Sequence, residues 1–186
     1  MIHGRARTLT VAAAIGALVA TTAAGSAALA GGDGRGDDSA FQERLTGFEE
    51  DPLVFSTTGN GQIRLRVDED ARTITYRLTY AGTESAVTQA HIHFGGRHQS
   101  GGVSVFLCTN LGNGPAGTPA CPPAPGTVQG TLRPADVIGP VLQGIAPGEF
   151  DELVDAIHAG VTYANVHTEI RTGGEIRGQI NDHHHG

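Results

Sequence analysis

The segment 62–80 has the sequence QIRLRVDEDARTITYRLTY, and its pattern indicates the fold class. Apolar side chains occupy every second position, first at Ile63, Leu65 and Val67 and again from Ile74 to Tyr80. Because successive side chains of a β-strand point to opposite faces, this period of two predicts two half-buried strands. The polar residues between them predict a tight turn, so the segment is expected to form a hairpin.

Short alternating runs recur along the chain, separated by Gly, Pro, Asn and Asp. They predict further strands at 87–94, 103–108, 127–132, 161–170 and 175–180, with a Gly/Pro-rich loop at 109–126. One segment differs, because Phe150, Leu153, Val154 and Ile157 recur at helical spacing and predict a short helix over one end of the core. Together these runs predict an all-β protein. We expect an antiparallel β-sandwich, Greek-key, immunoglobulin-like or superoxide-dismutase-like, with one short helix.

The two ends of the chain differ from this pattern. Residues 1–30 combine Arg5 and Arg7, an apolar run and a small-residue site ending at Ala30, which predicts a secretory signal peptide; an uncleaved anchor is the alternative. Residues 31–40 are expected to form a flexible leader, 41–181 the domain and 182–186 a His-rich tail. The predicted location is therefore secreted or at the cell exterior, with no membrane span after cleavage.

The charge of the chain limits its partners. Its formal net charge is -7. Loss of the two signal arginines makes the exported chain more acidic, and no basic cluster offsets this charge. Nucleic-acid binding is not expected. An extracellular protein or a cell-surface ligand is the predicted type of partner.

Cys108 and Cys121 are the two cysteines of the chain, and they flank the Gly/Pro-rich loop. In an exported protein an even pair at this spacing predicts a structural disulfide. Such a bond would stabilise the fold by about 3 kcal/mol in the chain-entropy model.

Three histidines lie on the polar faces of two predicted strands. His91 and His93 share a face because they are two residues apart, and His167 lies on the strand 161–170. If these strands are neighbours, the three imidazoles can converge on a Cu or Zn ion, and His98 is a candidate fourth ligand.

A structural role for the same histidines is the alternative. Asn165, Glu175 and Arg177 could join them in one buried polar network, with Glu175 and Arg177 as an ion pair. The acidic residues at 49–51 are expected to be solvated. Ser104 lacks the context of a catalytic nucleophile, so no catalytic residue is predicted.

The chain resembles the CHRD domain, the module named from chordin and also found singly in exported bacterial proteins. The motifs that carry this resemblance are LTGFEEDP at 45–52, TGNG at 58–61, AHIHFG at 90–95, GGVSV at 101–105, YANVHT at 163–168 and GGEIRGQI at 173–180. A looser, local likeness to copper-zinc superoxide dismutase rests on the His-x-His strand.

The resemblance implies an all-β extracellular domain. From it we predict an exported, non-catalytic binding or structural module. The alternative is a Cu- or Zn-binding protein, either a carrier or a dismutase-like redox enzyme, that uses His91, His93 and His167.

Overall fold

The structure is a computed structural model that describes residues 38–181. The predicted signal segment 1–30, residues 31–37 of the predicted leader and the His-rich tail 182–186 lie outside the described residues. The first strand begins at Asp38, so it includes the last residues expected to belong to the leader.

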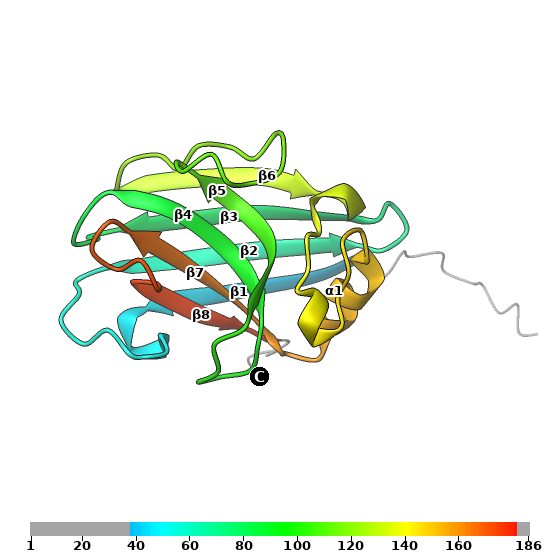
Figure 1. Cartoon of the computed structure of the whole chain (residues 1–186), viewed down its shortest axis with the longest axis horizontal. Helices are drawn as coiled ribbons and strands as arrows, with labels where there is room; N and C mark the ends of the chain where they lie inside the picture. Colours follow the sequence, from blue (N-terminus) through cyan, green and yellow to red (C-terminus); the bar gives the residue numbers. More distant parts are fainter. Residues whose placement is uncertain (1–37, 182–186) are drawn as a thin grey trace, which may run out of the picture. The chain divides into compact units, whose positions relative to one another are not determined.

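Eight strands and one α-helix make up the domain (Figure 1). The strands are β1 (Asp38–Thr46), β2 (Asn60–Asp68), β3 (Thr73–Ala81), β4 (Val87–Phe94), β5 (Gly102–Thr109), β6 (Gly126–Leu132), β7 (Thr162–Thr168) and β8 (Ile176–Ile180). The helix α1 spans Phe150–His158, and three short 3-10 helices lie at Gly47–Glu49, Pro134–Asp136 and Val141–Gln143. All the predicted strands and the helix form, whereas β1 was not predicted.

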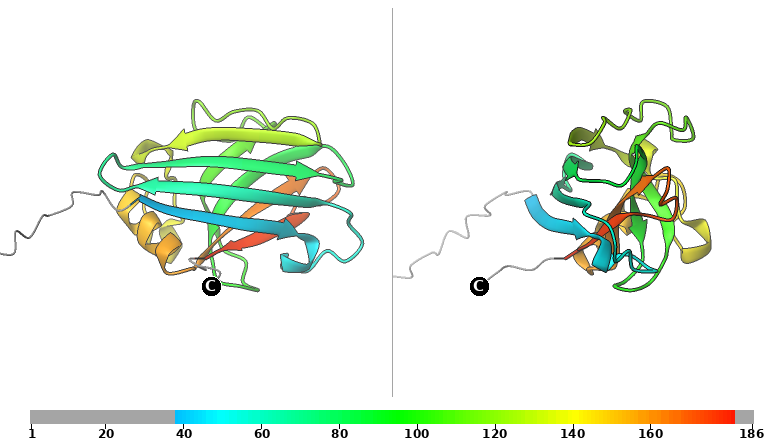
Figure 2. Two further views of the ribbon diagram at one scale, coloured as in Figure 1. Left: turned by 180° about the vertical axis from the view of Figure 1, so that it is seen from behind. Right: turned by 90° about the vertical axis from the view of Figure 1, so that its left-hand side faces the viewer.

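The strands form one antiparallel sheet in the order β5-β4-β7-β8-β1-β2-β3-β6. In the sheet, β8 pairs with β1 only at Thr46 and Arg177, whereas β1 and β2 pair from Asp38 to Thr46. The sheet folds over at this short junction into two layers, β5-β4-β7-β8 and β1-β2-β3-β6, which are seen from opposite sides in Figures 1 and 2. The predicted antiparallel β-sandwich is confirmed.

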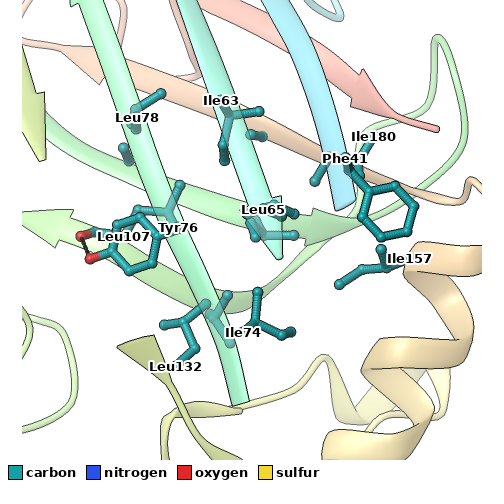
Figure 3. Close-up of a cluster of buried hydrophobic side chains, with 14 of the residues drawn as sticks. Phe41, Ile63, Leu65, Ile74, Tyr76, Leu78, Leu107, Leu132, Ile157 and Ile180 are labelled. Atoms are coloured by element: carbon teal, nitrogen blue, oxygen red, sulfur yellow. Dashed lines mark hydrogen bonds between the residues drawn. The ribbon is translucent and has the colours of Figure 1, made fainter. Parts of the chain in front are cut away.

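The main hydrophobic core lies between the two layers (Figure 3). Its fully buried side chains include Ile63, Ile74 and Leu78 from one layer and Leu107 from the other. The Tyr76 hydroxyl donates a hydrogen bond of 2.6 Å to the Leu107 carbonyl and so ties the layers together. The apolar face of α1 is buried against one end of this core, as predicted.

The Cys108–Cys121 disulfide is present, as predicted. The bridged loop is held against β4 by Asn110, whose side-chain amide donates to the carbonyls of Val87 and Cys121. Within residues 38–181, no helix is both long enough and apolar enough to cross a bilayer.

Candidate metal centre

A second buried region lies on the outer face of the layer β5-β4-β7-β8. In β4, Ala90 and Ile92 point into the main core, and alternation places His91 and His93 on the opposite face. Although their side chains face outward, His91, His93 and His167 are buried, with only 2%, 7% and 6% of each residue's surface exposed to solvent. The outer face of a sandwich strand is usually solvated. This face must therefore be covered by other parts of the chain.

Three segments cover it: residues 47–57, residues 95–101 and the turn at 171–174, together called the cover below. The carbonyls of Gly95 and Gly96 accept hydrogen bonds from the side chains of Gln179 and Arg177 on β8. Two of the covering segments are also joined to each other. Arg97 pairs with Glu49, and the Ser100 hydroxyl donates to Asp51.

The strand register brings the three histidines together. β4 pairs directly with β7, with His91 opposite Asn165 and Gln89 opposite His167. One ring nitrogen of each histidine lies within 4.8 Å of those of the other two, and Nδ1 of His91 is 3.1 Å from Nε2 of His167. The condition that the histidine-bearing strands be neighbours is therefore met.

Two backbone carbonyls determine which nitrogen of each ring carries the proton. Nδ1 of His93 lies 2.9 Å from the Gly101 carbonyl, and Nδ1 of His167 lies 2.9 Å from the Thr172 carbonyl. Because a carbonyl can only accept, both Nδ1 atoms carry a proton and both Nε2 atoms present a lone pair. This arrangement, in which the other ring nitrogen donates to a carbonyl, is typical of metal-binding histidines.

In the absence of an ion, His91 donates from Nδ1 to the Nε2 lone pair of His167. Nε2 of His91 is then unprotonated and also carries a lone pair. The Nε2 atoms of His91 and His93 are both buried and have no hydrogen-bond partner among the described residues.

Burial keeps all three imidazoles neutral. Desolvation, together with the neighbouring His167 and His93, lowers the pKa of His91 to about 2. Burial lowers the pKa of His93 to about 4, against the opposing effect of its bond to Gly101, and it also lowers the pKa of His167. Neutral imidazole is the form that binds a metal, so the group is ready to act as a ligand set.

Aromatic rings hold the imidazoles in place. The Phe106 ring meets His91 edge-on with centroids 4.4 Å apart, at a point where the pairing of β4 with β5 shifts register. Tyr163 stacks on His93 at 4.8 Å, and Arg177 lies over the other face of Tyr163 with Cζ 3.4 Å from the ring centroid. The hydroxyl of Tyr163 also accepts a hydrogen bond from the Gly101 amide.

A buried carboxyl, Glu50, accompanies Arg177. Burial raises the pKa of Glu50 to about 7, although the charge of Arg177 and a bond from Asn165 act in the opposite direction. Gly174 gives Glu50 its space, because a Cβ there would lie 2.4 Å from Oε1 of Glu50, and its φ of 131° is one that side chains rarely adopt. The expectation that the acidic run at 49–51 is solvated is wrong for Glu50, which is 4% exposed.

The predicted network of Asn165, Glu175 and Arg177 is divided in the structure. Glu175 is fully buried, and its carboxylate accepts from the hydroxyls of Thr57 and Thr168 and from the Glu84 amide. Arg177 instead donates to the carbonyl of Gly96 and to the side chain of Gln179. The expected ion pair between Glu175 and Arg177 is replaced by these separate partners.

His98 is not brought to the other three histidines. It is exposed, has a φ of 58° and lies outside the group of His91, His93 and His167. Among residues 38–181 this group includes no Cys, Asp or Glu.

Comparison with protein-family models matches residues 41–180 to the CHRD domain. No curated protein and no solved structure matches the chain. The matched region extends from β1 to the end of β8 and includes all three clustered histidines. Since the match covers most of the sequence, the chain belongs to the CHRD domain family.

Proposed function

We propose that this CHRD-domain protein acts outside the cell as a non-catalytic binding module that holds one copper or zinc ion through His91, His93 and His167. The observation that carries the proposal is the convergence of three neutral imidazoles, two of which have their Nδ1 protons directed to backbone carbonyls. The lone pairs that remain are those a metal ion requires.

A purely structural role for the histidines explains less. In a metal-free polar network, Nε2 of His91 and Nε2 of His93 are both buried without a hydrogen bond of ordinary distance and angle, although the Asn165 side chain lies beside His93. Each such atom costs about 1 to 3 kcal/mol. An ion that takes an Nε2 lone pair replaces the missing donor of that atom, so metal binding accounts for a feature that the structural alternative leaves unexplained.

Burial also favours holding an ion over turning over a substrate. The imidazoles lie under the cover, where His91, His93 and His167 are 2%, 7% and 6% exposed, and this burial limits the approach of a substrate. A dismutase-like centre would also require an acidic zinc ligand, and the three-histidine group includes none among the described residues. The disulfide and the predicted signal segment support a location outside the cell.

The test is the metal content of the full chain, purified without metal-affinity resin. We expect about one Cu or Zn per chain, and loss of that metal in His91→Ala/His93→Ala. The matched control is His98→Ala, which changes an exposed histidine outside the group. A second control replaces His183, His184 and His185 by Ser, which separates binding by the tail from binding by the strands.

Circular dichroism of each variant shows whether it is folded. A metal-free parent that takes up neither ion at micromolar concentration would show the proposal to be wrong. The same conclusion follows if the folded double variant binds as much metal as the parent.

A further inference from the structure

We infer that the three-histidine centre is selective for monovalent copper, Cu(I), over the divalent ions Zn(II) and Cu(II). This inference rests on the proposed function, since it concerns which ion the same three side chains hold. It is carried by the charge of the ligands, by the charges around them and by the number of ligands.

The first argument is the charge of the ligand set. All three donors are neutral imidazoles, and the group includes no carboxylate or thiolate among residues 38–181. The cost of transferring an ion from water into a poorly polarisable interior rises with the square of its charge, so a divalent ion costs about four times as much as a monovalent one. Without an anionic ligand to offset that cost, the centre favours the ion of lower charge.

The second argument is the buried cation beside the centre. Arg177 is 2% exposed, and its guanidinium lies over Tyr163, which in turn stacks on His93. Positive charge at the histidines is therefore repelled by Arg177 across a single aromatic ring. Glu50, Asp51 and Glu49 interact with Arg177 and offset part of its charge, but none of them belongs to the three-histidine group. This repulsion is twice as large for a divalent ion as for Cu(I).

The third argument is the coordination number. Zinc in structural sites takes four ligands, and Cu(II) favours tetragonal sets of four or more. Cu(I), a closed-shell ion, is satisfied by two or three nitrogen donors. The Nε2 atoms of His91 and His93 have almost no exposed surface, and Phe106 and Tyr163 pack against these two rings. Three donors in a closed site match Cu(I).

Sulfur ligands do not contribute to this selectivity. The only methionine of the sequence is Met1, and both cysteines form the disulfide. The preference would therefore come from charge and ligand number, and it would be lost if an anionic ligand were added to the group.

The experiment compares the ions on the full chain with Ser in place of His183, His184 and His185. Cu(I) is titrated without oxygen against the chromophoric chelator bicinchoninate, and Zn(II) and Cu(II) are titrated against chelators of known affinity. We expect one Cu(I) per chain, retained against about a hundredfold excess of Zn(II). His167→Gln should release the Cu(I), whereas His98→Gln should not.

The outcomes separate this inference from the proposed function. Stoichiometric Zn(II) or Cu(II) that binds as tightly as Cu(I), or displaces it, would overturn the preference for Cu(I) and leave the metal-binding function intact. Failure of all three ions to bind the folded parent would overturn both. Because the comparison uses the parent protein, it does not depend on whether the His167→Gln variant folds.

Discussion

Tyr163 lies parallel to His93, with ring centroids 4.8 Å apart and planes 4° from parallel. The opposite face of Tyr163 carries the Arg177 guanidinium. One aromatic ring thus separates a buried cation from a candidate metal ligand, and it keeps both in place.

Replacement of Tyr163 should distinguish its ring from its hydroxyl. Tyr163→Phe keeps the stacking and removes only the acceptor of the Gly101 amide, so it should lower the free energy of unfolding by about 1 kcal/mol. Tyr163→Leu removes the surface between His93 and Arg177 and should cost about 3 kcal/mol. Urea unfolding measures both values, and equal losses in the two variants would contradict a role for the ring.

The metal-free protein should lose stability as the pH falls below about 6.5. The histidines are neutral when folded, with the pKa of His91 lowered to about 2 and that of His93 to about 4, whereas the unfolded chain takes up protons near pH 6.5. Their stabilising effect is complete above pH 6.5 and is lost as the pH decreases. Glu50 acts in the opposite direction, because its raised pKa favours the folded state at lower pH.

The destabilising effect of three histidines is larger than the stabilising effect of one carboxyl. We therefore expect the free energy of unfolding to fall by about 2 to 4 kcal/mol between pH 6.5 and 5. Urea unfolding at several pH values, with a chelator present, checks this. His167→Gln should reduce the slope of stability against pH. A parent protein equally stable at pH 5 and 7 would contradict the expectation that the buried imidazoles are neutral.

Glu50→Gln should become more favourable as the pH rises. The pKa of Glu50 is raised to about 7 from an ordinary value of 4.5, so the folded state prefers the neutral carboxyl. The stability associated with that neutral form is complete below pH 4.5 and is lost as the pH rises through 7. The difference in unfolding free energy between variant and parent should therefore shift in favour of the variant by about 2 to 3 kcal/mol from pH 5 to 8.

The matched control is Glu152→Gln, which changes an exposed carboxylate on α1 and removes no buried charge. Parallel pH profiles for Glu50→Gln and the parent would show that the Glu50 carboxyl is not held in its neutral form.

Loss of the disulfide should weaken the fold. Cys108 and Cys121 are 13 positions apart, and a crosslink over a loop of that size restricts the unfolded chain by about 3 kcal/mol. The double variant Cys108→Ala/Cys121→Ala should unfold at correspondingly lower urea concentration than the oxidised parent. Reduction of the parent by dithiothreitol serves as the second measurement, and an unchanged midpoint in both would contradict the prediction.

The strands with clear alternation could be predicted from sequence, but β1 could not. In β1 only Phe41 and Leu45 belong to the main core, and polar residues separate them, so the local pattern is weak. The strand forms because it pairs along its whole length with β2. That pairing is a contact between segments distant in sequence, which a local pattern does not report.

The sequence also predicted only part of the site, because local alternation shows which residues share a face but not which strands are neighbours. Alternation placed His91 and His93 on one face, but only the pairing of β4 with β7 brings His167 to them. Glu50 was missed because its burial depends on the cover folding over β8 and on the absence of a side chain at Gly174. No signal within the acidic run at 49–51 distinguishes Glu50 from its solvated neighbours.

The imidazoles and the main core occupy opposite faces of the same strands. Replacement of a clustered histidine therefore leaves no cavity between the two layers, and replacement of a core residue does not remove any of the three histidines. If the proposed ion binds, substitutions that alter its ligands and substitutions that alter the core fall on alternate residues of β4 and β7, so the ion-binding group can be redesigned while the two-layer scaffold is kept.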